Sequence, residues 1–221
     1  MFPSFELFGR QIGLYGVFAV LGVLFAGFVA SRLIKKFNIT FEDTLLIMLA
    51  TLFSGFIFGH LVYGLTNFSA VVKMFAHIGD LWFEKFIVLF GVLFGGMVYY
   101  GGFIGGIIGI LIYTHFDKNL NRNNVLDIYA VVMPAFHIFG RIGCFFGGCC
   151  YGIESDFGFT VTNNTINPSI NGVNRFPVQL LESLLNLLIF LVLLYLIKHD
   201  KCVGNLLYIY MIIYPIVRFF D

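Results

Sequence analysis

Charged side chains are scarce in this sequence. They make up 11% of its 221 residues, whereas an ordinary soluble domain carries about 25%. Hydrophobic residues account for 59%, and the formal net charge is +1. The composition excludes an ordinary soluble domain, predicts an integral membrane protein, and gives no basic surface for a nucleic-acid partner.

Cysteines and targeting signals are also few. Cys144, Cys149 and Cys150 cluster and Cys202 stands alone, which is not the paired spacing of a disulfide-stapled secreted domain. The N-terminal "MFPSFELFGRQIG" has no basic region before its apolar run and no small-residue cleavage site. We therefore expect no removable signal peptide and a first helix that stays in the membrane.

Long polar stretches are missing too, so we predict a single integral membrane domain over 1–221. A helix needs roughly 20 apolar residues to cross a bilayer. About six such runs lie near 11–34, 44–65, 86–113, 125–147, 178–197 and 203–220. The prediction is an all-α, polytopic transmembrane helical bundle. Between the second and third runs, we expect a short amphipathic helix anchored at the interface by Trp82, Phe83 and Phe86.

The basic residues of the short loops predict the orientation. Seven follow the first, third and fifth runs: Arg32, Lys35, Lys36, Lys118, Arg122, Lys198 and Lys201. Four lie on the other side: Arg10, Lys73, Lys85 and Arg175. This bias places the N-terminus outside and makes 152–177 a small extracytoplasmic loop region of turns and short strands.

An arginine interrupts the apolar stretch "HIFGRIGCFFGGCCYG". Burying Arg141 in lipid costs about 2.5–3.5 kcal/mol, so such residues usually face a cavity or a partner. Gly140 and Gly143 flank it and allow close approach, while His137 and Cys144 share its helical face.

Arg218, in "YPIVRFFD", is a second arginine within an apolar segment. Two guanidinium groups at one cavity suit a phosphate, because each offers planar, permanently charged donors. Two alternatives stay open: Arg218 snorkels to the interface, and Arg141 only forms a salt bridge to Glu182 or Asp127.

Two further stretches are informative. "YYGGFIGG", Tyr99 to Gly106, exposes backbone for close approach beside tyrosine hydroxyls, although helix packing explains its glycines equally well. In "RFPVQLLESLLN", Pro177 can start a helix, and Gln179, Glu182 and Asn186 form one polar face. Glu182 there requires a cation, which Arg141 or Arg218 supplies.

The three clustered cysteines allow three readings. In the first, they ligate a soft metal, although their C-x4-C-C spacing is not a recognised zinc pattern. In the second, they include a reactive thiolate activated by Arg141. In the third, they pack as small apolar residues among glycines. We favour packing and predict neither a bound metal nor a cofactor.

These motifs resemble those of the bacterial prolipoprotein diacylglyceryl transferases. "GRIGCFFGGCCYG" is similar to their G-R-x-G-N-F-x-N-G-E signature, "YGGFIG" to H-G-G-L-I-G, "FPVQLLES" to H/Y-P-x-Q-L-Y-E, and "YPIVRFFD" to R-F-x-x-E. The four matches occur in the family's order and cover most of the chain.

The resemblance implies a transferase of lipoprotein biosynthesis in the bacterial cell membrane. It would move the diacylglyceryl group of phosphatidylglycerol onto the lipobox cysteine of a preprolipoprotein. The implied catalytic residues are Tyr100, Arg141 and His137. The implied substrate-binding residues are Arg141, Arg218, Gly101, Gly102, Gly140, Gly143, Cys144, Gln179 and Glu182.

The chain departs from the family at polar positions. Tyr100 stands in place of the H-G-G histidine, Cys144 in place of the signature asparagine, and Cys149 in place of the glutamate. The family also continues into a further helix, so we expect a shorter relative or a fragment. The alternative function is a non-catalytic or altered-acceptor lipid-binding membrane protein with a thiol-based role.

Overall fold

The computed structural model describes residues 4–7, 10–69, 94–162 and 170–220, together with a few single residues between 70 and 93. Among these residues, five helices are long and apolar enough to cross a membrane, and a shorter apolar helix covers Leu206–Phe219. The prediction of a polytopic α-helical membrane protein is thereby confirmed. Most of the expected interfacial helix, Trp82 included, lies outside the described residues; Phe83 and Phe86 are described, and both are helical and exposed.

The chain divides into two compact units, Met1–Phe37 with Leu126–Asp221, and Asn38–Val125. We call them the terminal unit and the central unit. The prediction of a single membrane domain stays a prediction, because two compact helical units can belong to one domain.

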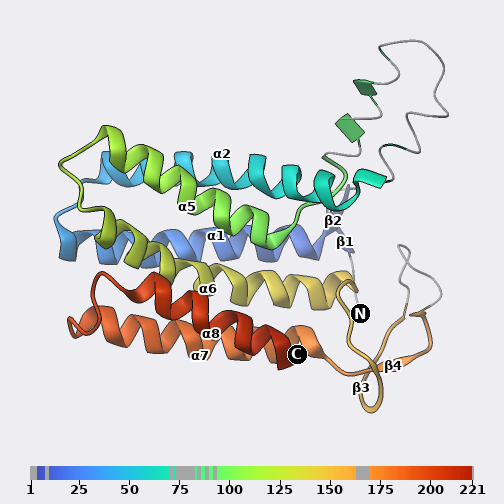
Figure 1. The fold of residues 1–221 in the computed structure, drawn as a ribbon. Helices are drawn as coiled ribbons and strands as arrows, with labels where there is room; N and C mark the ends of the chain where they lie inside the picture. The colour runs from blue at the N-terminus through green and yellow to red at the C-terminus, as the bar shows by residue number, and fades with distance from the viewer. Residues whose placement is uncertain are drawn as a thin grey trace. The chain divides into compact units, whose positions relative to one another are not determined.

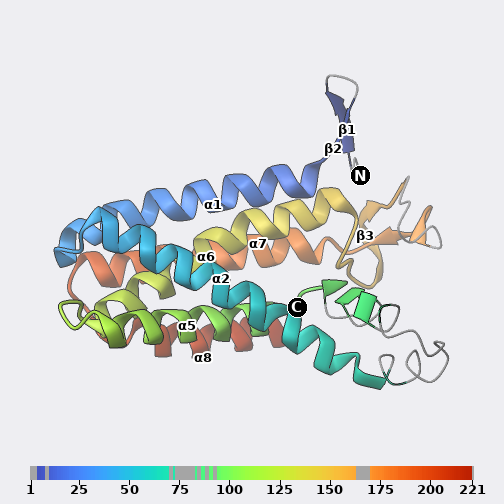
Figure 2. The ribbon, with the colours of Figure 1, turned by 90° about the horizontal axis from the view of Figure 1, so that it is seen from above.

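The terminal unit consists mainly of long helices that run alongside one another (Figures 1 and 2). Its helices are α1 (Leu14–Leu33), the 3-10 turn η1 (Ile34–Phe37), α6 (Arg122–Gly147), α7 (Val178–Lys198) and α8 (Leu206–Phe220); the first turn of α6 belongs to the central unit. Its strands are β1 (Ser4–Leu7), β2 (Arg10–Gly13), β3 (Glu154–Thr160) and β4 (Asn174–Arg175). Strands β1 and β2 form one antiparallel hairpin, and β3 pairs with β4 in another.

Local signals in the sequence explain several of these boundaries. Helix α7 begins after Pro177, as the sequence predicts, because proline lacks the N–H group that the first turn leaves unpaired. The predicted loop 152–177 does contain two short strands, β3 and β4.

Helix α8 begins where a distant carboxylate satisfies its first backbone donors. Asp127 of α6 accepts hydrogen bonds from the backbone N–H groups of Gly204 and Leu206. Asp127 is only 1% exposed to solvent. One of the two acidic residues considered as a partner for Arg141 is therefore engaged by α8 instead, because the free N–H groups of a helix start attract an anion.

The central unit contains α2 (Phe41–Thr66) and α5 (Tyr99–Phe116). Helix α2 begins at an N-cap, Thr40, whose side chain accepts a hydrogen bond from the backbone N–H of Asp43 at 3.1 Å. The third apolar run, predicted over 86–113, is not one continuous helix. Residues 95–98 are not helical, because two consecutive glycines, Gly95 and Gly96, disfavour helix there.

Glycines hold α2 and α5 together. A methyl group added at Gly101 would lie 2.6 Å from the carbonyl oxygen of Phe58, and one at Gly105 would lie 2.6 Å from that of Ser54. The two helices lie side by side in both views (Figures 1 and 2). Small residues at intervals of four permit this approach in a membrane, where dispersion contacts drive helix association.

Candidate functional site

Helices α6 and α7 turn polar faces toward each other inside the terminal unit. The buried polar residues of α7 are Gln179, Glu182, Ser183 and Asn186. Their spacing of three and four places them on one face of the helix. Because the surrounding residues are apolar, each of these groups needs a partner from within the protein.

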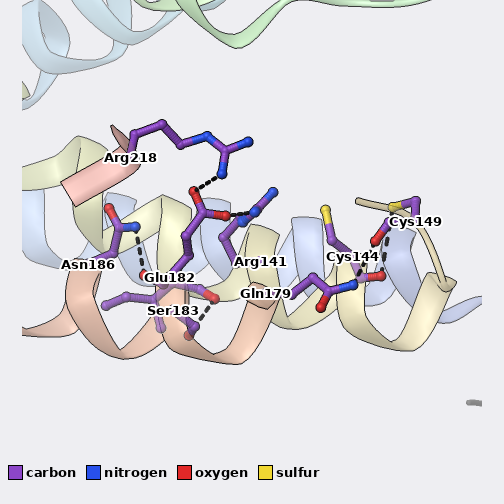
Figure 3. Close-up of polar contacts among 9 residues, drawn as sticks. Arg141, Cys144, Cys149, Gln179, Glu182, Ser183, Asn186 and Arg218 are labelled. Carbon is purple, nitrogen blue, oxygen red and sulfur yellow. Dashed lines mark hydrogen bonds and ion pairs between the residues drawn. The ribbon is translucent and has the colours of Figure 1, made fainter. Parts of the chain in front are cut away.

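The centre of the site is a carboxylate between two arginines. Glu182 Oε2 forms an ion pair with Arg141 Nη2, and Glu182 Oε1 lies 3.3 Å from Arg218 Nη1. Figure 3 shows both guanidinium groups approaching the same carboxylate from different helices. The sequence prediction that Glu182 takes Arg141 or Arg218 as its partner is confirmed, and it takes both.

The three charges differ in their exposure. The side chain of Glu182 is 1% exposed and that of Arg141 is 9% exposed, whereas that of Arg218 is 45% exposed. One carboxylate against two guanidinium groups leaves a net charge of +1. The triad therefore presents a buried cation next to a more accessible one, an arrangement that attracts an anionic headgroup.

Neutral side chains of α7 donate hydrogen bonds to backbone carbonyl groups near the triad. Ser183 Oγ donates a hydrogen bond to the carbonyl of Ile138 at 3.0 Å, and Asn186 Nδ2 donates to that of Glu182 at 2.8 Å. Gln179 Nε2 donates to the carbonyl of Cys149 at 2.8 Å (Figure 3). The bonds of Ser183 and Gln179 fix α7 against α6 and the turn after it, whereas the bond of Asn186 lies within α7.

The two glycines beside Arg141 have different surroundings. A methyl group at Gly143 would lie 3.2 Å from Phe18 Cβ and 3.3 Å from a ring carbon of Tyr15. At Gly140 the nearest atom would be a ring carbon of His137 at 4.0 Å. Gly143 thus serves the packing of α1 on α6, whereas Gly140 leaves open space beside Arg141.

His137 is buried on the arginine-bearing helix. His137 is 9% exposed to solvent, and the centroid of its ring lies 5.3 Å from that of Tyr214 on α8. Tyr100, Gly101 and Gly102 belong to the central unit, in the first turn of α5, and Tyr100 is 44% exposed.

The cysteines gather where α6 ends. The sulfurs of Cys144, Cys149 and Cys150 all lie within 4.8 Å of one another, and all four cysteines are free thiols. Hydrogen bonds from Cys144 and Cys149, together with the positive charge of Arg141, hold the pKa of Cys150 below its ordinary value.

Sequence reasoning missed Ser183 and the role of Asp127. Ser183 lies four residues after Gln179, so its position on the polar face was visible as a helical spacing. Asp127 gave no such signal, because its partners are backbone groups 77 and 79 residues away.

Several helices able to span a membrane and a partly buried arginine–glutamate–arginine site define a polytopic membrane protein with an anion-attracting centre. The chain matches the family model of prolipoprotein diacylglyceryl transferase over residues 4–221. It therefore belongs to that family, as its motifs predict.

Curated relatives agree with this assignment. The phosphatidylglycerol–prolipoprotein diacylglyceryl transferase 2 of Clostridium perfringens is 32% identical over 97% of this chain and 79% of its own length. The phosphatidylglycerol–prolipoprotein diacylglyceryl transferase of Clostridium tetani is 29% identical over 97% of this chain and 81% of its own length. The transferase of the same name from Clostridioides difficile is 30% identical over 98% of this chain and 80% of its own length.

Proposed function

We propose that this protein transfers the diacylglyceryl group of phosphatidylglycerol to the lipobox cysteine of a prolipoprotein. The family assignment and the names of the relatives support this reaction. The observation that carries it for this chain is the pair of arginines that share Glu182 and retain a net positive charge.

The chemistry explains why a fixed cation is needed. The substrate sulfur attacks the carbon of the diacylglyceryl group that bears the phosphate. A carbon–sulfur bond forms, and the bond between this carbon and the phosphate oxygen breaks. Glycerol 1-phosphate leaves with the bonding electrons. Guanidinium donors held in place before the reaction stabilise the charge that develops on this leaving group.

Glu182 orients these donors and does not compete fully for them. Each guanidinium has five N–H donors, and one carboxylate engages only part of them. In the proposed complex, Arg141 holds the phosphate, Arg218 supports it from the more exposed side, and Gly140 leaves room for the headgroup. Gln179, through the Cys149 turn, keeps Cys144 next to this space.

Tyr100 and His137 are the proposed proton acceptors for the substrate thiol. Gly102, near Tyr100, forms the proposed backbone approach for the lipid, whereas Gly101 packs against α2. The two acceptors are distinguished by comparing Tyr100→Phe with His137→Gln, since only loss of the true base removes the acidic limb of the pH–rate profile.

Reconstitution tests the reaction. Purified protein in liposomes with labelled phosphatidylglycerol and a lipobox peptide should yield a peptide heavier by one diacylglyceryl group. Arg141→Ala should lower the rate at least a hundredfold, as loss of a donor to a developing anion typically does. Arg32→Ala, in the last turn of α1, is the control and should retain activity. Phospholipid binding without any modified peptide from the wild-type protein would reject this acceptor.

We also infer that the protein resides in the bacterial cell membrane with its N-terminus outside. This orientation places Cys150 outside and Cys202 in the cytoplasm, and both residues are exposed. A membrane-impermeant maleimide applied to spheroplasts should label Cys150 and spare Cys202 until the membrane is opened. The reverse pattern would invert the topology.

A further inference from the structure

Three thiols form a compact triangle after the last turn of α6. Their sulfurs all lie within 4.8 Å of one another. Figure 3 shows the side chains of Cys144 and Cys149 near each other, just beyond Arg141 along the helix. The reaction described above places Cys144 next to the substrate and assigns no role to Cys149 or Cys150.

The turn that brings the thiols together is well defined. Cys149 N–H donates to the carbonyl of Cys144 at 3.2 Å, and Gln179 holds the Cys149 carbonyl from α7. Gly148 and Cys150 have positive φ values of 69° and 52°. A cysteine rarely adopts this conformation, so the fold holds Cys150 where its sulfur faces the other two.

We propose that Cys144, Cys149 and Cys150 bind one divalent, thiophilic cation of the zinc and cadmium class. Three thiolates select soft d10 ions over magnesium or calcium, which prefer oxygen ligands. Three sulfurs each about 2.3 Å from such an ion lie about 4 Å apart in a trigonal arrangement. The observed triangle requires less than about 1 Å of closure to reach it.

The surrounding charge favours a divalent ion. Three thiolates on a divalent cation carry one negative charge, which matches the net positive charge of the arginine–glutamate–arginine triad in the same unit. Arg141 lies one helical turn before Cys144 on α6, so its positive charge is close to the triangle. Monovalent copper would leave two negative charges, and three once the acceptor thiolate binds, so a divalent ion keeps the smaller charge at each stage. Because Cys150 is exposed, an ion can enter from its side.

Three protein ligands leave one position of a tetrahedral ion open. This step rests on the proposed function, in which the acceptor is itself a thiol. The open position binds the acceptor sulfur, and coordination makes this thiol more acidic, so that its proton passes to the proton acceptor proposed above. The bound thiolate then attacks the glycerol carbon as the carbon–oxygen bond to the phosphate breaks.

Cadmium is the probe for the site. Adding Cd²⁺ to the metal-stripped, purified full chain should produce a sulfur-to-cadmium ultraviolet band that saturates at one equivalent. Cys144→Ser, Cys149→Ser and Cys150→Ser should each weaken binding at least tenfold, while Cys202→Ser should not. Absence of the band in the wild-type protein would overturn the proposal, and so would equal binding by all four variants. Circular dichroism checks that the variants keep their helices.

A peptide tests the open position. A lipobox peptide added to the cadmium-loaded protein should increase the sulfur-to-cadmium band, and the same peptide with serine for its cysteine should not. No increase would show that the acceptor does not bind the ion. Failure of the metal site and failure of the proposed function are distinguishable: transfer without the band removes the site, and the band without transfer removes the reaction.

Discussion

Arg141 and Glu182 form an ion pair between α6 and α7, and both side chains are at least nine-tenths buried. Arg218 adds a second cation to the same carboxylate. Removing one member of a buried pair leaves the other charged and unsatisfied, which costs about 3–5 kcal/mol. The pair is thus as important to folding as to the proposed binding of phosphate.

Glu182→Gln should therefore destabilise the protein strongly. The substitution keeps the shape of the side chain but leaves two guanidinium groups without an anion. We expect a loss of about 3–5 kcal/mol in the free energy of unfolding, measured by denaturant unfolding in detergent. The control is Glu154→Gln, which breaks a pair with Arg175 at 3.3 Å whose carboxylate is 72% exposed, and it should cost about 1 kcal/mol or less. Equal losses in both variants would contradict this role of Glu182.

The glycines of α5 allow a matched comparison. Gly105→Ala should separate α2 from α5, because its new methyl group would lie 2.6 Å from Ser54 O and from Phe58 Cβ. Gly102→Ala meets only Gly55 O at 3.6 Å, an ordinary contact. We expect a loss of about 1–3 kcal/mol for Gly105→Ala and a much smaller one for Gly102→Ala.

The measurement for the glycines is the melting temperature together with the transfer rate. If Gly102 contacts the lipid as proposed, Gly102→Ala should lower the rate while leaving the melting temperature almost unchanged. A melting temperature that falls as far for Gly102→Ala as for Gly105→Ala would show that both glycines serve packing alone.

The sequence predicts the triad because lipid leaves a charged residue few alternatives. Glu182 lies on a polar helical face, and Arg141 and Arg218 are arginines within apolar segments, so pairing among them follows from the cost of burial. The same reasoning left two partners for Arg141 open. Asp127 was kept as a partner because it is acidic, although 14 residues of α6 place it about 21 Å from Arg141 along the helix.

Other features required the structure because their partners are backbone atoms or distant in sequence. The glycine spacing of α5 is compatible with lipid contact and with helix packing, and only the positions of Ser54 and Phe58 assign Gly101 and Gly105 to packing. The cysteine triangle depends on a turn with left-handed backbone at Cys150. No residue pattern predicts that conformation for a cysteine, so packing was the natural interpretation.

Asp127→Ala should destabilise the start of α8. The substitution removes the acceptor for the backbone N–H groups of Gly204 and Leu206 in a buried position. Hydrogen bonds to a charged group contribute about 1.5–3 kcal/mol each, so we expect a loss of at least about 2 kcal/mol by denaturant unfolding. Asp117→Ala is the control, because Asp117 accepts from the backbone of Asn119 in an exposed turn. A loss no larger than that of the control would contradict the assignment.

Cys150 should react as a thiolate at unusually low pH. Hydrogen bonds from Cys144 and Cys149 and the charge of Arg141 lower its pKa, so the thiolate persists as the pH falls below the ordinary range near 8.5. Alkylation by iodoacetamide, followed by mass spectrometry in the presence of a chelator, should show a midpoint below that of a free cysteine peptide. Because Cys144 is the largest cause of the shift, Cys144→Ala should move the midpoint upward, and Arg141→Gln should do so to a smaller extent. A midpoint at or above that of the peptide in the wild-type protein would show that these groups do not stabilise the Cys150 thiolate.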